Sequence, residues 1–214
     1  MLKTTLITAG PFETNTYVLQ NTDTGDAVLV DPCCDFDRVT DIVDRELQAR
    51  VQAILITHGH FDHNFGAGFF EDKYAVPVYM NHRDIELVEM LKPKALMWGF
   101  AESDFRQPSR YTDLRDGDRL EPGGIGIRVL EAPGHSRGSL VYVTDAGAFC
   151  GDVIFRLSIG RYDFEGGNRE ELMESISSKI LTLPDDTPLY PGHGEVTTVG
   201  FERLANPYIR DCIS

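Results

Sequence analysis

The string Thr-His-Gly-His-Phe-Asp-His at residues 57–63 is the feature that most constrains this chain. It follows the apolar run VQAILIT, which has the length and unbroken hydrophobicity of a buried strand. Three of the six histidines in the chain therefore lie with one aspartate at the carboxyl end of that strand: His58, His60, Asp62 and His63. By average residue usage, chance produces such a cluster in about one chain in a thousand. We expect a metal-binding loop here rather than a polar turn.

Imidazole and carboxylate groups are ligands that suit zinc, iron and manganese. The loop alone does not complete two metal sites, because each metal needs three or four protein ligands and an open position. Further ligand types follow predicted strands in the strings APGHS, FCGDV and YPGHG, each after a glycine that lets the backbone bend sharply. We assign the ligands as follows: His58, His60 and His135 to one metal, Asp62, His63 and His193 to a second, and Asp152 to a bridge between them.

Hydrophobic periodicity predicts two β-rich halves, each followed by helices. In the first half we expect strands at residues 2–8, 15–21, 26–32, 51–57 and 76–80, and helices at 37–47, 64–74 and 81–91. In the second half we expect strands at residues 126–133, 139–145, 148–152 and 187–192, and a helix at 168–183 capped by Asn168. Residues 92–112 have no clean period and predict an irregular excursion. The pattern indicates an α/β fold, a four-layer αββα sandwich formed as a single domain by residues 1–214.

The composition excludes several classes of partner. The chain has 34 Asp and Glu against 20 Lys and Arg, a formal net charge of −14, and no basic stripe, which argues against a nucleic-acid partner. No apolar run approaches the roughly 20 residues of a membrane span, and the start resembles no secretory leader, so we expect a cytoplasmic protein without a membrane partner. The four cysteines lack paired spacing and are expected to be free thiols: Cys33, Cys34, Cys150 and Cys212.

Taken together, these strings resemble the metallo-β-lactamase fold superfamily, whose signature is H-x-H-x-D-H followed by a distant His, Asp and His. The segments GPFETNTYVL, GDVIFRLSIGRYDFEGG and PGHGEVTTVGFERLANPYI narrow the resemblance to glyoxalase II-like hydrolases without a C-terminal helical domain. The resemblance implies an αββα sandwich with two divalent ions, zinc or iron or manganese, at one edge. It also implies hydrolysis of a thioester such as S-D-lactoylglutathione to a hydroxy acid and a thiol.

In such a hydrolysis the nucleophile is hydroxide, because metal coordination lowers the pKa of water from near 16 to about 7. We expect Asp62 and Asp152 to be catalytic by holding and orienting that hydroxide or its metals. Asp31 matches an acidic position behind a ligand histidine, although a turn aspartate before Pro32 is an equal explanation. Arg161 lies where the family has a basic residue that contacts substrate, and we assign it to substrate binding.

Two departures from the family concern glutathione. The tyrosines that the family places two positions beyond the basic residue and beyond the last histidine are here Asp163 and Glu195. The helical domain that supplies part of the glutathione site has no counterpart in this sequence. Both departures argue against tight glutathione recognition. His82, outside the ligand set, is expected to be a surface or capping residue.

Other activities remain open at this point. A persulfide dioxygenase of the same fold uses a single iron held by two or three of the same ligands, and a lactone offers its carbonyl to the same hydroxide. A module that keeps the fold without turnover is a third alternative. The net charge disfavours nucleases, and Asp152 disfavours secreted β-lactamases, which usually offer cysteine there. We expect a small-molecule thioester as the partner, and the sequence leaves the oligomeric state open.

Overall fold

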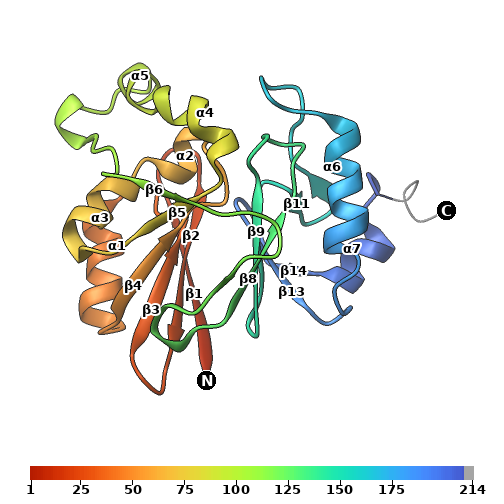
Figure 1. The fold of residues 1–214 in the computed structure, drawn as a ribbon, viewed down its shortest axis with the longest axis horizontal. Coiled ribbons are helices and arrows are strands. Elements are labelled where there is room, and N and C mark those ends of the chain that lie inside the picture. Colours follow the sequence, from red (N-terminus) through yellow and green to blue (C-terminus); the bar gives the residue numbers. More distant parts are fainter. Residues whose placement is uncertain (210–214) are drawn as a thin grey trace.

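Two six-stranded sheets form the centre of the computed structural model, which describes residues 1–209 (Figure 1). The first sheet has the order β1-β2-β3-β4-β5-β6 and the second the order β14-β13-β10-β9-β8-β7. The strands of the first sheet are β1 (Leu2–Ala9), β2 (Thr14–Asn21), β3 (Asp26–Val30), β4 (Arg50–Leu55), β5 (Val78–Met80) and β6 (Tyr111–Asp113). Those of the second are β7 (Arg119–Leu120), β8 (Ile127–Glu131), β9 (Leu140–Thr144), β10 (Gly147–Gly151), β13 (Pro188–Pro191) and β14 (Thr197–Thr198), and β11 (Ile154–Phe155) pairs separately with β12 (Ser158–Ile159).

The sheets pack face to face, and helices cover their outer faces. Between the sheets lies an apolar core with Leu19 and Leu55 from the first sheet and Tyr142 and Phe149 from the second. The helical segments are α1 (Phe36–Asp41), η1 (Ile42–Glu46), α2 (Phe61–Asn64), α3 (Ala67–Tyr74), η2 (His82–Asp84), α4 (Ile85–Glu89), α5 (Leu91–Met97), η3 (Glu102–Asp104), η4 (Pro122–Gly124), α6 (Arg169–Ser175), η5 (Ile176–Ile180) and α7 (Val199–Ala205). A second core lies under α1 and α3 and a third under α6 and α7. The expected four-layer αββα sandwich is confirmed.

Strand direction brings several loops to one edge of the sandwich. β3, β4, β5 and β6 pair in parallel, so their carboxyl ends lie at the same edge of the first sheet. In the second sheet β10 pairs in parallel with β13, so these two strands also end together. The bridge between Thr14 and His193 joins the start of β2 to the loop after β13, and thus joins the two sheets at this edge.

Several boundaries differ from the sequence prediction, and two of these differences change an element. The helix expected at residues 64–74 is split, and its first part, α2, already begins at Phe61. Residues 92–112, expected to be irregular, contain most of α5 and the start of β6, the sixth strand of the first sheet. A strand of three residues carries too few side chains to show a period. The cap of α6 is as expected, since the Asn168 side chain accepts hydrogen bonds from two backbone N–H groups of the first turn.

Two further expectations concern cysteines and membranes. Cys33, Cys34 and Cys150 are buried and form no disulfide among the described residues, and Cys212 lies outside them. Burial raises the pKa of the Cys150 thiol, which disfavours its reactive thiolate form. Within residues 1–209, every helix is too short or too polar to cross a bilayer.

Replacing a leucine between the sheets tests the face-to-face packing. Leu19 is fully buried there, whereas Leu204 on α7 is 82% exposed. Leu19→Ala is expected to lower the free energy of unfolding by about 2–5 kcal/mol, because it removes buried methyl groups and leaves a cavity. Leu204→Ala is the matched control, with a change within about 0.5 kcal/mol. Urea unfolding of the metal-free protein measures both, and equal losses in the two variants would contradict the packing.

Candidate metal centre

The edge where the strands end collects every ligand that the sequence predicts. His58 and His60 lie on the loop after β4, and the next two ligands, Asp62 and His63, lie on α2. The remaining ligands lie on loops of the second sheet: His135 between β8 and β9, Asp152 after β10, and His193 after β13. Their ligand atoms form three overlapping groups, each within 4.8 Å: His58, His60 and His135; His58, His63 and Asp152; Asp62, His63 and His193. Thus the fold joins residues up to 135 positions apart in the sequence into one cluster, from His58 to His193.

The first group consists of three imidazoles. Nε2 of His135 lies 3.2 Å from Nε2 of His58 and 2.8 Å from Nδ1 of His60. The other ring nitrogen of His135, Nδ1, lies 2.7 Å from the backbone oxygen of Arg161. A donor bond from Nδ1 to that oxygen fixes the ring and leaves Nε2 with a free lone pair. The three nitrogens therefore lie close enough together to bind one metal ion.

The second group combines imidazoles with a carboxylate. Oδ2 of Asp62 lies 3.2 Å from Nε2 of His193 and 3.6 Å from Nε2 of His63. Asp62 and His193 keep side-chain exposures of 21% and 29%, whereas His63 is fully buried. The cluster is therefore accessible from the side of Asp62 and His193.

Asp152 lies between the two groups. Its Oδ1 is 3.3 Å from Nε2 of His63, and its Oδ2 is 3.5 Å from Nε2 of His135 and 3.7 Å from Nε2 of His193. One carboxylate thus contacts ligand nitrogens of both groups. This is the placement that a carboxylate shared by two cations requires.

Two buried atoms of the cluster are polar and unsatisfied, which tests whether a cation fits. Nε2 of His63 and Oδ1 of Asp152 have no hydrogen-bond partner among residues 1–209, although they lie 3.3 Å apart. A buried polar group without a partner costs about 1–3 kcal/mol. Both atoms are metal-ligand types, and a divalent cation beside them would satisfy both at once. The residues therefore fit a divalent metal.

The electrostatics of the cluster point the same way. Burial and neighbouring histidines lower the pKa of His58 far below its usual value, and burial with the nearby His135 lowers the pKa of His60 to about 3. Both imidazoles are thus neutral near pH 7, which is the form that binds metals. Burial opposes ionisation of Asp152, but the charges of His63, His135 and His193 outweigh it and hold the pKa of Asp152 well below its usual range.

His63 is supported from behind by Asp31. Nδ1 of His63 lies 2.9 Å from Oδ2 of Asp31, and the same carboxylate accepts hydrogen bonds from the hydroxyl and the backbone N–H of Thr57. Burial opposes protonation of His63, but Asp152, Asp62 and Asp31 raise its pKa well above the usual value. Of the two explanations weighed for Asp31, contact with a ligand histidine is the one that the structure bears out. Asp31 has a φ of +48°, so its backbone adopts the uncommon left-handed region to make this contact.

Asn15 supports the loop of His193 in a similar way, and the sequence gives no sign of it. The backbone N–H of Asn15 donates to Gly192 O at 2.8 Å, and its side-chain amide donates to Pro191 O and Gly194 O at 3.1 and 2.9 Å. These bonds enclose the loop that carries His193. Asn15 lies 178 positions before His193, and no pattern in the strand NTYVLQN singles it out.

The predicted substrate residue Arg161 lies at the rim. Its guanidinium makes two hydrogen bonds to the carboxylate of Asp163, at 2.9 and 2.8 Å, and lies 4.0 Å from the ring centre of Phe164. The Phe164 ring is in turn 5.7 Å from that of His60. On the other side of the cluster, Arg156 pairs with Glu195. His82 is exposed, as expected for a surface residue.

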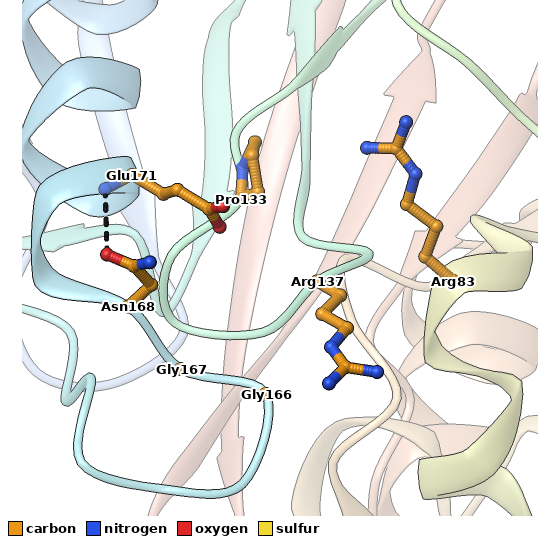
Figure 2. Close-up of a pocket in the computed structure, with 7 residues that line it drawn as sticks. All are labelled: Arg83, Pro133, Arg137, Gly166, Gly167, Asn168 and Glu171. Atoms are coloured by element: carbon orange, nitrogen blue, oxygen red, sulfur yellow. Dashed lines mark hydrogen bonds between the residues drawn. The ribbon is translucent and has the colours of Figure 1, made fainter.

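A hollow of about 370 Å³ is lined by Pro133 and Arg137, which lie between β8 and β9 (Figure 2). Its lining includes Arg83 and Arg137, together with Glu171 of α6. Both arginines already have acidic neighbours, Glu131 at 3.3 Å and Glu86 at 3.8 Å. None of the candidate metal ligands lines this hollow.

Comparison with known proteins identifies the family. The sequence pattern of the metallo-beta-lactamase superfamily matches residues 9–193, so the chain belongs to this superfamily. A Haemophilus influenzae protein named hydroxyacylglutathione hydrolase GloC is 34% identical over 190 residues, which cover 87% of this chain and 89% of that protein. The family that the sequence motifs suggested is confirmed.

Solved structures agree with this result. BLEG-1, described as a B3 metallo-beta-lactamase, has a TM-score of 0.86 and 35% identity, covering 97% of this chain and 99% of BLEG-1. TTHA1623, solved in a di-iron-bound form, has a TM-score of 0.84 and 33% identity, covering 95% of this chain and 99% of its own. The likeness extends over nearly the whole of each chain.

Removing the central carboxylate tests the centre. Asp152→Ala is expected to lose bound metal and activity together, because it deletes the carboxylate oxygens that face both ligand groups. Asp145→Ala, at an exposed position between β9 and β10, is the matched control and should keep both. Metal analysis after dialysis measures the first effect, and the hydrolysis assay described under Proposed function measures the second. An Asp152→Ala protein with full metal content and full activity would show that the bridge is misassigned.

Proposed function

We propose that this protein is a metal-dependent hydrolase that cleaves a thioester such as S-D-lactoylglutathione with two divalent ions. The observation that carries this proposal is the pair of three-ligand groups with Asp152 between them. A pair of metals in such proximity serves to stabilise both the attacking and the leaving groups of a displacement. The name of the Haemophilus relative, a hydroxyacylglutathione hydrolase, supports the same substrate class.

When bound, the metals would lower the pKa of a coordinated water to about 7 and polarise the substrate carbonyl. His58, His60 and His135 would hold one ion, and Asp62, His63 and His193 the other. The chain's own part is to orient the reactants. Asp62 and Asp152 would orient the nucleophile on the exposed side: a carboxylate oxygen would accept the one hydrogen of the hydroxide, which leaves a lone pair free for the carbonyl.

The leaving group favours a thioester over an amide. A thiol has a pKa of about 8.5, so the thiolate leaves without a proton from a dedicated acid. A β-lactam nitrogen is a poorer leaving group and gains from protonation. The likeness to BLEG-1 nevertheless makes β-lactam hydrolysis the second candidate, and a lactone is a third substrate class with the same carbonyl chemistry.

The identity of the metals is part of the proposal. Histidine and carboxylate ligands accept zinc, iron and manganese alike. The di-iron form of TTHA1623 supports iron as one choice for a related site. A persulfide dioxygenase would need only one iron, whereas the orphaned atoms of His63 and Asp152 favour a second ion beside the first group.

The cellular setting remains a prediction as well. We infer a cytoplasmic enzyme with a small-molecule substrate. The three buried cysteines form no disulfide within residues 1–209, as a reducing compartment would keep them. A net charge of −14 disfavours nucleic acid, but two divalent ions would add four positive charges locally. An anionic thioester would therefore meet a locally cationic site.

Metal analysis paired with a thioester assay tests the proposed function. Protein loaded with zinc or with iron is expected to hold two ions per chain and to hydrolyse S-D-lactoylglutathione, and chelation should abolish turnover, which added metal should restore. A chromogenic cephalosporin is the comparison substrate, with a kcat/KM at least about 100-fold lower. A single iron with oxygen uptake on glutathione persulfide, or faster turnover of the cephalosporin, would refute the proposal.

Arg161 provides a separate test of substrate binding. Arg161→Ala is expected to raise KM for an anionic thioester about 10- to 150-fold with little change in kcat, because a charge-assisted hydrogen bond contributes about 1.5–3 kcal/mol. The backbone oxygen that holds His135 is retained in this variant. Arg119→Ala, at an exposed position on β7, is the control and should leave KM unchanged. An unchanged KM in Arg161→Ala would mean that Asp163 keeps the guanidinium from the substrate.

A further inference from the structure

A buried aspartate outside the ligand set contacts two of the ligand loops. Asp84 ends the short helix η2 and is only 1% exposed. Its Oδ2 accepts hydrogen bonds from the backbone N–H of Gly59 at 2.8 Å and from the hydroxyl of Ser136 at 2.7 Å. Its Oδ1 accepts one from the backbone N–H of Gly138 at 2.6 Å. Both carboxylate oxygens are thus satisfied by the two loops.

These donors are the neighbours of the first ligand group. Gly59 lies between His58 and His60, and Ser136 directly follows His135. One carboxylate from the first half of the chain therefore connects the loop after β4 to the loop between β8 and β9. Figure 2 shows the loop that carries Arg137 beside the turn that carries Arg83, the residue before Asp84.

Gly59 and Gly138 pack closely against Asp84, which leaves the two ligand loops little room to move. A Cβ atom on Gly59 would lie 2.8 Å from the backbone oxygen of Asp84, and one on Gly138 would lie 2.7 Å from its Cγ. Real Cβ atoms essentially never approach so near, so glycine is needed on both loops. A shift of either loop would also leave a buried carboxylate without its donors, which costs several kcal/mol.

The second ligand group has different supports. Asp31 bonds to His63, and Asn15 encloses the loop of His193. The hydrogen bonds of Asp84 go instead to residues beside His58, His60 and His135. Asp31 also reaches the first group, because the Thr57 hydroxyl that donates to Asp31 lies 3.1 Å from Nδ1 of His58. Asp84, in contrast, forms its hydrogen bonds only beside ligands of the first group.

We propose that Asp84 is a positioning residue that sets the metal affinity of the first group, His58, His60 and His135, independently of the second. This inference rests on the metal binding of the proposed function, but not on its substrate. Outer partners that orient ligand loops typically change metal affinity by about 10–100-fold when they are lost. Asp84 touches no ligand atom in the described structure and acts through the backbone of Gly59 and Gly138.

The test is Asp84→Asn, titrated with zinc against a competing chelator. Asparagine keeps the shape but turns one acceptor into a donor, which faces the N–H of Gly59 or of Gly138. In a His193→Ala background, where the first group is the intact one, Asp84→Asn is expected to weaken zinc binding about 10–100-fold. In a His135→Ala background, which leaves the second group intact, it should change zinc affinity by less than about 3-fold.

Two further variants separate positioning from folding. Asp113→Asn is the matched control, because Asp113 accepts a hydrogen bond from the backbone N–H of His82 in the same turn but touches neither ligand loop. It should leave both zinc affinities unchanged. Ser136→Ala removes one of the three donors and should weaken the first group alone, by less than Asp84→Asn does. Thermal unfolding of each metal-free variant reports whether it folds.

The outcomes are distinct. Unchanged zinc affinity in both backgrounds, or equal weakening in both, would overturn the role of Asp84. If Asp84→Asn does not fold, Ser136→Ala decides in the same backgrounds, and an unchanged first group would likewise overturn it. Zinc binding is measured without substrate, so inactivity on thioesters would refute the proposed function and leave this result standing.

Discussion

The ligand edge of this sandwich depends on electrostatic interactions between buried imidazoles and buried carboxylates. His58 and His60 are kept neutral by burial beside other histidines, while His63 and Asp152 lie 3.3 Å apart with buried atoms that no other described group satisfies. Such an arrangement is costly for the protein alone and favourable once divalent cations replace protons. The same groups that would destabilise a metal-free fold thus fit divalent metal ions.

The αββα architecture supplies this arrangement through strand direction. β3, β4, β5 and β6 pair in parallel, as do β10 and β13, so the loops that follow these strands lie at one edge. The apolar core between the sheets holds the two sheets together. Buried polar residues one step further out then hold the loops themselves. Asp31 fixes the ring of His63, Asn15 fixes the backbone beside His193, and Asp84 fixes the loops of the first group. Hydrogen bonds thus fix the loops around the site, while Asp62 remains partly exposed to solvent.

The sequence shows which candidate ligands gather at this edge, but it shows little of the residues that support them. The cluster at residues 57–63 is recognisable because three histidines and an aspartate are adjacent in the chain, and His135 and His193 stand out as histidines after glycine. Asn15 and Asp84 act on residues distant in sequence, so no local pattern marks them. Arg161 was identified by family resemblance, but its pairing with Asp163 became visible only with the side chains in place. Likewise, β6 is too short for periodicity to reveal and is defined by its partner β5.

The central claim is that two ligand groups share one carboxylate, and anomalous diffraction tests it most directly. Crystals of the metal-loaded protein, measured at the absorption edges of zinc and iron, would show where the metals lie. We expect two anomalous peaks, one among His58, His60 and His135 and the other among Asp62, His63 and His193, each with an oxygen of Asp152 in coordination distance. A single peak in fully loaded crystals, or two peaks without Asp152 as a common ligand, would contradict the account.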